Sequence, residues 1–205
     1  MSQEDQSRWD ARYREQADED EFAASALLDD ALARLSSERA DLEGMTALDI
    51  ACGGGRNSLR LAESGFWVDA VDVSAEGLAL GERRAALSGS DEAAKRIRWI
   101  QADLDDGLPV AGSYDLIVMV RYLALTLLVD AIELLRPGGV LVVELHMDAG
   151  GEAVSGPRNP AYLVAPGALA EVTGGLSPWL LEEGVFQIGD DRREALARFV
   201  GRVPD

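Results

Sequence analysis

Short apolar stretches alternate with helix-like segments along the middle of the chain. Runs such as Leu116–Val120 and Val140–Val143 are continuously apolar, which is typical of strands buried on both faces of a parallel sheet. The segments between them carry apolar residues at helical spacing and are closed by Gly or Pro. This alternation predicts βαβ units and an α/β fold whose doubly wound, mostly parallel sheet has helices on both faces.

The pattern also predicts where each element begins and ends. Strands are expected at Ala47–Ala51, Phe66–Val71, Ile97–Gln101, Tyr114–Val120 and Val140–Leu145. Helices are expected at Ala23–Leu35, Asn57–Glu63, Ala75–Leu87, Leu125–Leu135 and, after the Gly- and Pro-containing loop Asp148–Pro160, at Pro166–Thr173. Two last strands, Leu180–Ile188 and Ala195–Val203, are expected to pair as an antiparallel hairpin. The polar first 22 residues contain the acidic run Asp18–Glu21, which we expect to be a solvated helix face or loop.

Charge narrows the possible partners. The 205 residues include 37 acidic and 19 basic side chains, a net charge of −18, and Lys95 is the single lysine. Nucleic-acid binders and peripheral membrane proteins use clusters of basic residues, so neither partner is expected. The N-terminus does not resemble a signal peptide, the apolar runs are too short to span a bilayer, and the one cysteine, Cys52, cannot form an internal disulfide. A cytoplasmic protein is expected.

The stretch Leu48–Asn57 carries the chemistry. It runs from a buried strand through the glycines Gly53–Gly55 into a helix, and such a turn lets a ligand approach the backbone and the unpaired N–H groups of the helix start. Asp72 ends the next strand, 17 residues after Gly55, where its carboxylate can accept hydrogen bonds from ribose hydroxyls. Together these features predict a site for a nucleoside-containing cofactor.

Two residues favour one such cofactor. Ser58 occupies the third glycine position of the dinucleotide fingerprint G-x-G-x-x-G, which weakens an NAD interpretation. Asp49, just before the turn, would repel a pyrophosphate but offers a partner to a cationic amino group. S-adenosylmethionine (SAM) has such an amino group and no phosphate. An NAD-linked oxidoreductase and a non-catalytic protein that binds SAM or S-adenosylhomocysteine (SAH) remain the alternatives.

The same residues resemble a known family. Asp49-Ile-Ala-Cys-Gly-Gly-Gly resembles motif I of class I SAM-dependent methyltransferases, and Leu48–Leu61 with Asp72-Val-Ser resembles the small bacterial enzymes grouped with tellurite-resistance and thiopurine methyltransferases. The resemblance covers roughly residues 8–146. Four further features carry it: Trp9-Asp-Ala-Arg-Tyr13, Asp103 after the third strand, Tyr114-Asp-Leu-Ile-Val and Leu135-Arg-Pro-Gly-Gly-Val-Leu. It implies a single-domain Rossmann-like fold with a seven-stranded, mostly parallel sheet and an antiparallel C-terminal hairpin.

The resemblance also implies roles for individual residues. Residues 1–22 would cover the cofactor, and residues 23–205 would form the methyltransferase domain. The residues expected to contact SAM are Trp9, Tyr13, Asp49, Ala51, Gly53, Gly55, Asn57, Asp72, Val73, Asp103, Leu104 and Val120. Arg121, Tyr122 and His146 are the catalytic candidates, with His146 or Tyr122 as a possible general base. No set of metal ligands is visible.

Structural roles remain open for several candidates. Asn57 is also placed to cap a helix, Arg121 to form salt bridges, and Trp9 and Tyr13 to pack the first helix. Arg158, in the loop Gly156–Pro160, belongs either to a ligand-binding loop or to a surface turn. The expected function is methyl transfer from SAM to a small molecule such as a thiol, a chalcogen oxyanion or another small nucleophile.

Overall fold

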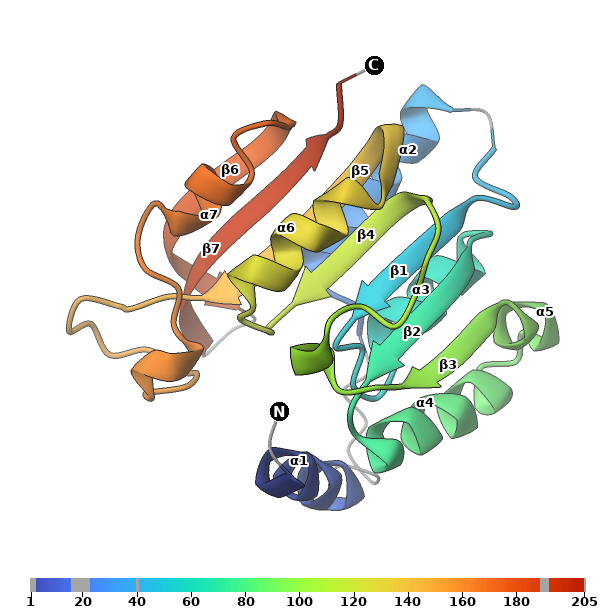
Figure 1. Cartoon of the computed structure of the whole chain (residues 1–205), viewed down its shortest axis with the longest axis horizontal. Helices are drawn as coiled ribbons and strands as arrows, with labels where there is room; N and C mark the ends of the chain where they lie inside the picture. Colours follow the sequence, from blue (N-terminus) through green and yellow to red (C-terminus); the bar gives the residue numbers. More distant parts are fainter. Residues whose placement is uncertain (1–2, 16–22, 40, 189–191, 205) are drawn as a thin grey trace.

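The protein is described from a computed structural model that places residues 3–15, 23–39, 41–188 and 192–204. Seven strands form one sheet in the order β3-β2-β1-β4-β5-β7-β6 (Figure 1). Strands β1 to β5 are parallel, and β7 runs antiparallel to both β5 and β6, as predicted. The strands are β1 (Thr46–Ile50), β2 (Trp67–Asp72), β3 (Ile97–Gln101), β4 (Tyr114–Val120), β5 (Leu135–His146), β6 (Ser177–Ile188) and β7 (Arg192–Arg202).

Helices cover both faces of the sheet, because alternate residues of each strand point to opposite sides. In β4, Leu116 and Val118 pack against one helix layer, whereas Ile117 and Met119 pack against the other, and all four are fully buried. The first layer contains α2 (Ala26–Glu38), α3 (Arg56–Glu63), α4 (Ala75–Leu87) and α5 (Asp91–Lys95), and the second contains α6 (Leu125–Glu133) and α7 (Ala168–Val172). The predicted doubly wound α/β arrangement is therefore confirmed.

The largest boundary difference lies at β5, which begins at Leu135 rather than Val140 and so includes Pro137 and Gly138. Proline has no N–H to give to a ladder, so it is tolerated in a strand where the pairing is irregular. The β4–β5 register shifts between Tyr114 and Leu116, opposite this segment. The short elements α5, η2 (Leu104–Asp106) and η3 (Pro160–Tyr162) were not predicted.

Helix α1 (Gln3–Glu15) lies at the carboxyl edge of the parallel strands, next to α4 (Figure 1). The Ser74 hydroxyl, at the start of α4, donates to Asp10 at 2.6 Å, and Arg14 pairs with Glu76 at 3.1 Å. Arg8 donates to the Tyr162 hydroxyl of η3 at 2.8 Å. One helix therefore connects α4 with η3 across this edge.

The acidic run Asp18–Glu21 lies outside the described residues. Within the described ranges, no helix has the length and apolar character needed to cross a membrane.

Candidate active site

The glycine turn follows β1, which neighbours β4 at the point where the strand order reverses. Ala51, Gly53 and Gly55 all have left-handed backbone conformations, with φ of 57°, 55° and 75°. Arg121, directly after β4, has φ of 64°. A residue with a Cβ pays roughly 1–2 kcal/mol for this conformation. Two such residues at adjacent strand ends mark the place where open α/β sheets bind ligands.

Two aromatic rings fill the space beside the glycines. A Cβ added to Gly53 would clash with the Tyr13 hydroxyl, and one added to Gly55 would clash with the Trp99 ring. Tyr13 comes from α1 and stacks on Trp9, with ring centroids 6.1 Å apart. Burial, and then the charge of Asp72, raises the pKa of Tyr13, so its hydroxyl stays protonated. Trp99 of β3 was not predicted, because nothing in the sequence shows that its ring reaches the turn.

Asp49 is almost completely buried, with 1 % of its surface exposed. The Ser58 hydroxyl donates to its Oδ2 at 2.6 Å, so the position that holds glycine in the dinucleotide fingerprint here supports a carboxyl group. Burial raises the pKa of Asp49 from 3.8 to about 7. A cation bound next to Asp49 would favour the charged form of this acid.

Asp72 is buried at the end of β2 and holds the glycine turn. Its Oδ2 accepts from the Gly53 N–H and its Oδ1 from the Ser74 N–H, both at 2.8 Å. Burial raises its pKa, while these hydrogen bonds oppose the shift. The predicted ribose acid is therefore attached directly to the predicted glycine turn.

The remaining cofactor candidates divide into two groups. Val73 follows β2 and Val120 ends β4. Asp103 and Leu104 lie two and three residues after β3, and Asp103 caps η2 by accepting from the Asp105 N–H at 3.0 Å. Asn57 differs, because its Oδ1 accepts from the Ser25 N–H at 2.9 Å and so connects α3 with the start of α2. Gly55, not Asn57, occupies the cap position of α3. A role for Asn57 toward a cofactor stays a prediction.

Arg121 belongs to a buried ion-pair network. Its Nε donates to Glu144 at 3.0 Å, and its guanidinium also pairs with Glu194. Both glutamates are less than 5 % exposed. Arg198 pairs with Glu144, and Arg192 with Glu194, each at 3.1 Å. The salt-bridged alternative for Arg121 is thus observed, and the network joins the ends of β4, β5 and β7.

His146 and Tyr122 are both poorly suited to accept a proton at neutral pH. Arg121 Nη1 lies 3.1 Å from His146 Nε2, and because a guanidinium only donates, Nε2 must be an acceptor. Burial, and then the charge of Arg121, lowers the pKa of His146 to about 4. Burial, and then Asp105, raises the pKa of Tyr122 to about 12. Contact of either residue with an acceptor stays a prediction.

Sequence comparison connects this geometry to a family. The profile described as "Methyltransferase domain" matches residues 47–139, from β1 through the glycine turn and Asp72 to the start of β5. Residues 47–139 are therefore similar to a methyltransferase domain.

Relatives of this methyltransferase domain are known by sequence and by structure. The chain is 34 % identical over 121 residues to the ubiquinone biosynthesis O-methyltransferase of Caulobacter vibrioides (55 % of this chain, 46 % of that one). It is also 34 % identical over 145 residues to the trans-aconitate 2-methyltransferase of Azoarcus sp. strain BH72 (66 % and 49 %). It therefore spans about half the length of these curated relatives. The crystal structure of TehB from Haemophilus influenzae has the same fold, with a TM-score of 0.66 and 18 % identity over 84 % of this chain and 61 % of that one.

The site contains one candidate residue that sequence reasoning missed. Arg56 begins α3 directly after the glycine turn and is half-buried. Among the described residues, its guanidinium has no recorded hydrogen bond or ion pair. Burial, and then the charge of Arg121, lowers its pKa, and Asp49 and Glu144 oppose the shift. The sequence signal that could have identified Arg56 is its position directly after Gly55, the last glycine of the turn.

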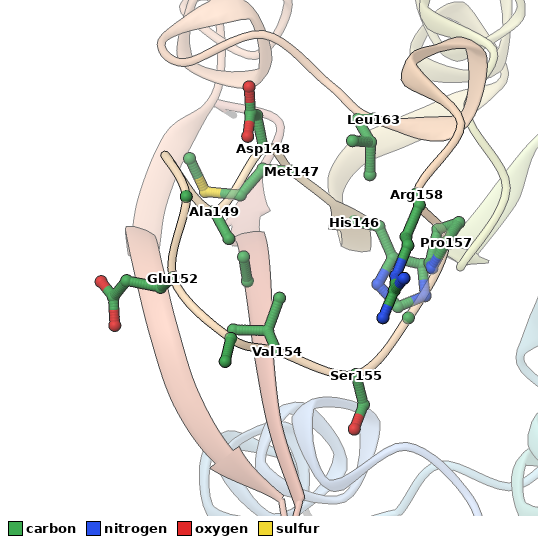
Figure 2. Close-up of a pocket in the computed structure, with 14 residues that line it drawn as sticks. His146, Met147, Asp148, Ala149, Glu152, Val154, Ser155, Pro157, Arg158 and Leu163 are labelled. Carbon is green, nitrogen blue, oxygen red and sulfur yellow. The ribbon is translucent and has the colours of Figure 1, made fainter.

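A cavity of about 310 Å³ lies next to His146, at the end of β5 (Figure 2). Its wall consists of residues 146–149, 151–158, Leu163 and Ala195. The loop expected at Asp148–Pro160 thus forms most of this wall, and Arg158 belongs to it.

Proposed function

We propose that the protein transfers a methyl group from SAM to a small-molecule acceptor. The observation that carries this proposal is the pair of buried acids, Asp49 and Asp72, on either side of a glycine turn. Asp72 suits the ribose of any nucleoside cofactor, whereas Asp49 would repel a pyrophosphate at the turn and pair with the amino group of SAM.

The residues present fit this cofactor. Each Asp72 oxygen can accept a further hydrogen bond, so it can receive ribose hydroxyls while it holds Gly53 and Ser74. Asp49 would hold the amino group, and Arg56, which has no recorded partner among the described residues, would hold the carboxylate. Val73 and Leu104 would flank the adenine, with Asp103 toward its amino group and with Ala51, Gly55 and Val120 near the methionine part.

Helix α1 would cover the bound cofactor. Tyr13 lies against Gly53 and Gly77, and α1 is attached to the domain on two sides, by Asp10 to Ser74 and by Arg8 to Tyr162. We propose that residues 1–22 act as the cover and residues 23–205 as the methyltransferase domain. Opening of α1 would then precede exchange of the cofactor.

Bound SAM would supply a methyl group activated by a positively charged sulfur. The task of the protein is mainly alignment, which can contribute about 7–11 kcal/mol. Neither His146 nor Tyr122 is tuned to take a proton at neutral pH. The site therefore favours an acceptor that is already anionic or that is a soft nucleophile. The two curated relatives, which are named for ubiquinone biosynthesis and for trans-aconitate, support a small molecule.

Binding and turnover experiments test the proposal. SAH should raise the melting temperature of the protein, whereas NAD should not, because a ligand stabilises the native state that it binds. Asp72→Ala should abolish the shift with SAH. Transfer of label from [methyl-³H]SAM should be measured against thiols, selenite, tellurite, phenols and small carboxylic acids. A shift with NAD instead of SAH would support the oxidoreductase alternative, and SAH binding without any labelled product would support the non-catalytic one.

A further inference from the structure

The cavity next to His146 has two unlike ends. His146, Pro157 and Arg158 lie at one end, and Met147, Ala149 and Val154 lie at the other (Figure 2). The second end also carries the acids Asp148 and Glu152, but Met147, Ala149 and Val154 give it apolar side chains. A ligand that fills the cavity therefore needs one polar group and an apolar body.

The polar end presents a fixed hydrogen-bond donor. Because Arg121 donates to Nε2 of His146, the neutral ring must carry its proton on Nδ1. The Nδ1 edge of the ring packs against Gly156, where an added Cβ would approach Nδ1 and Cε1 to 3.1 Å. Gly156 also lines the cavity, so the donor edge of His146 lies at the cavity wall.

Arg158 adds a positive charge at the same end. Within the described part of the chain, its guanidinium has no recorded hydrogen bond or ion pair. The two acids of the wall are directed away from the cavity (Figure 2). Glu152 pairs with Arg193 at 2.8 Å, and Asp148 accepts from the Gly150 N–H at 3.0 Å. The charge that the polar end offers to a ligand is therefore positive, in a chain whose net charge is −18.

We propose that this cavity binds a small carboxylate, with the anionic group between His146 Nδ1–H and Arg158 and the apolar body against Met147 and Val154. This inference rests on the proposed function, for which the cavity would be the acceptor site. His146 then acts as a hydrogen-bond donor to the acceptor, and Arg158 determines the preference for a negative charge. Arg121 positions the His146 ring by holding its Nε2 edge.

Matched pairs of probes test the proposal on the full chain in the presence of SAH. Cinnamate and hexanoate are compared with cinnamamide and hexanamide by isothermal titration calorimetry. Each carboxylate should bind at least about tenfold more tightly than its amide, because hydrogen bonds to charged groups are stronger. Arg158→Gln should remove this preference and leave amide binding unchanged. His146→Gln should weaken both classes, whereas His146→Asn keeps a donor near the Nδ1 position and should retain more affinity.

Controls separate this proposal from the proposed function. Arg83→Gln, at an exposed position of α4, makes the same change of charge and should keep the full carboxylate preference. Binding of SAH alone is measured for every variant and should stay within about twofold of the wild type. Equal binding of carboxylate and amide by the wild type, or an unchanged preference in Arg158→Gln, would overturn the proposal. A carboxylate preference in a protein that does not bind SAH would support the cavity and refute the methyltransferase activity.

Discussion

Replacing Asp49 with Asn would remove a buried carboxyl group and keep an oxygen that can accept from Ser58. Burial raises the pKa of Asp49 from 3.8 to about 7, so the folded protein holds a proton that the unfolded chain releases at a lower pH. The stability of the wild type should therefore fall as the pH rises from about 4 to about 7 and then level off. The stability of Asp49→Asn should lack this dependence on pH, because the variant has no carboxyl group at this position.

The size of the effect follows from the pKa. A change from 3.8 to about 7 corresponds to roughly 4 kcal/mol of destabilisation once Asp49 is ionised in both states. At pH 4.5 roughly 1 kcal/mol of it is present, and at pH 8 nearly all of it. The free energy of unfolding of Asp49→Asn minus that of the wild type should therefore increase by about 3 kcal/mol from pH 4.5 to pH 8.

Urea denaturation at pH 4.5 and pH 8, followed by circular dichroism, measures this difference. The same variant should bind SAH about 10- to 100-fold more weakly at pH 8, because a charge-assisted hydrogen bond to the amino group is lost. Glu82→Gln, an exposed position on α4, controls for the change of net charge. If the stability difference between Asp49→Asn and the wild type is the same at both pH values, the carboxyl group is not protonated in the folded protein and the reasoning fails.

Three further predictions concern the neighbours of this site. Gly53→Ala should lower the free energy of unfolding by about 1–2 kcal/mol, because the backbone is left-handed there, and its new Cβ should displace Tyr13. Displacement of Tyr13 would show as faster proteolysis within α1, and unchanged proteolysis would contradict it. Glu194→Gln should lower the free energy of unfolding by about 3 kcal/mol in urea titrations, because Arg121 loses a buried partner; a loss as small as that in Glu82→Gln would refute the pairing. Tyr122→Phe should leave the shape of the pH–rate profile unchanged between pH 6 and pH 9, since the pKa of Tyr122 is raised to about 12; a lost ionisation in that range would identify it as a base.

The sequence predicted the sheet well because its strands are short apolar runs between polar turns. β4 matches its expected bounds, since seven apolar or half-buried residues between polar turns leave few alternatives. The start of β5 was missed because Pro137 and Gly138 normally end structure, and here an irregular register accommodates them. The direction of the β6–β7 hairpin followed from two adjacent strands and a short connection.

The site was predictable where local sequence determines the geometry. The glycine turn and Asp72 are linked by one hydrogen bond across the βαβ unit, so their spacing carries the information. The partners of Arg121 were not predictable, because Glu194 lies 73 residues further along the chain and reaches Arg121 only through the β7 pairing. The tautomer of His146 depends on a second contact of Arg121, which crosses from the end of β4 to the end of β5.

Helix α1 has 13 residues, which makes it a rod of about 20 Å. Its C-terminal half contacts α4 beside the predicted ribose acid, through Asp10 and Arg14, and Arg8, near its middle, contacts η3, which follows the loop around the cavity. A molecule that moves the loop would therefore shift the rod at the nucleoside side as well. By thermodynamic reciprocity, the two binding events would then change each other's affinity by the same factor. The binding of the two ligands would be coupled through α1, without any contact between them.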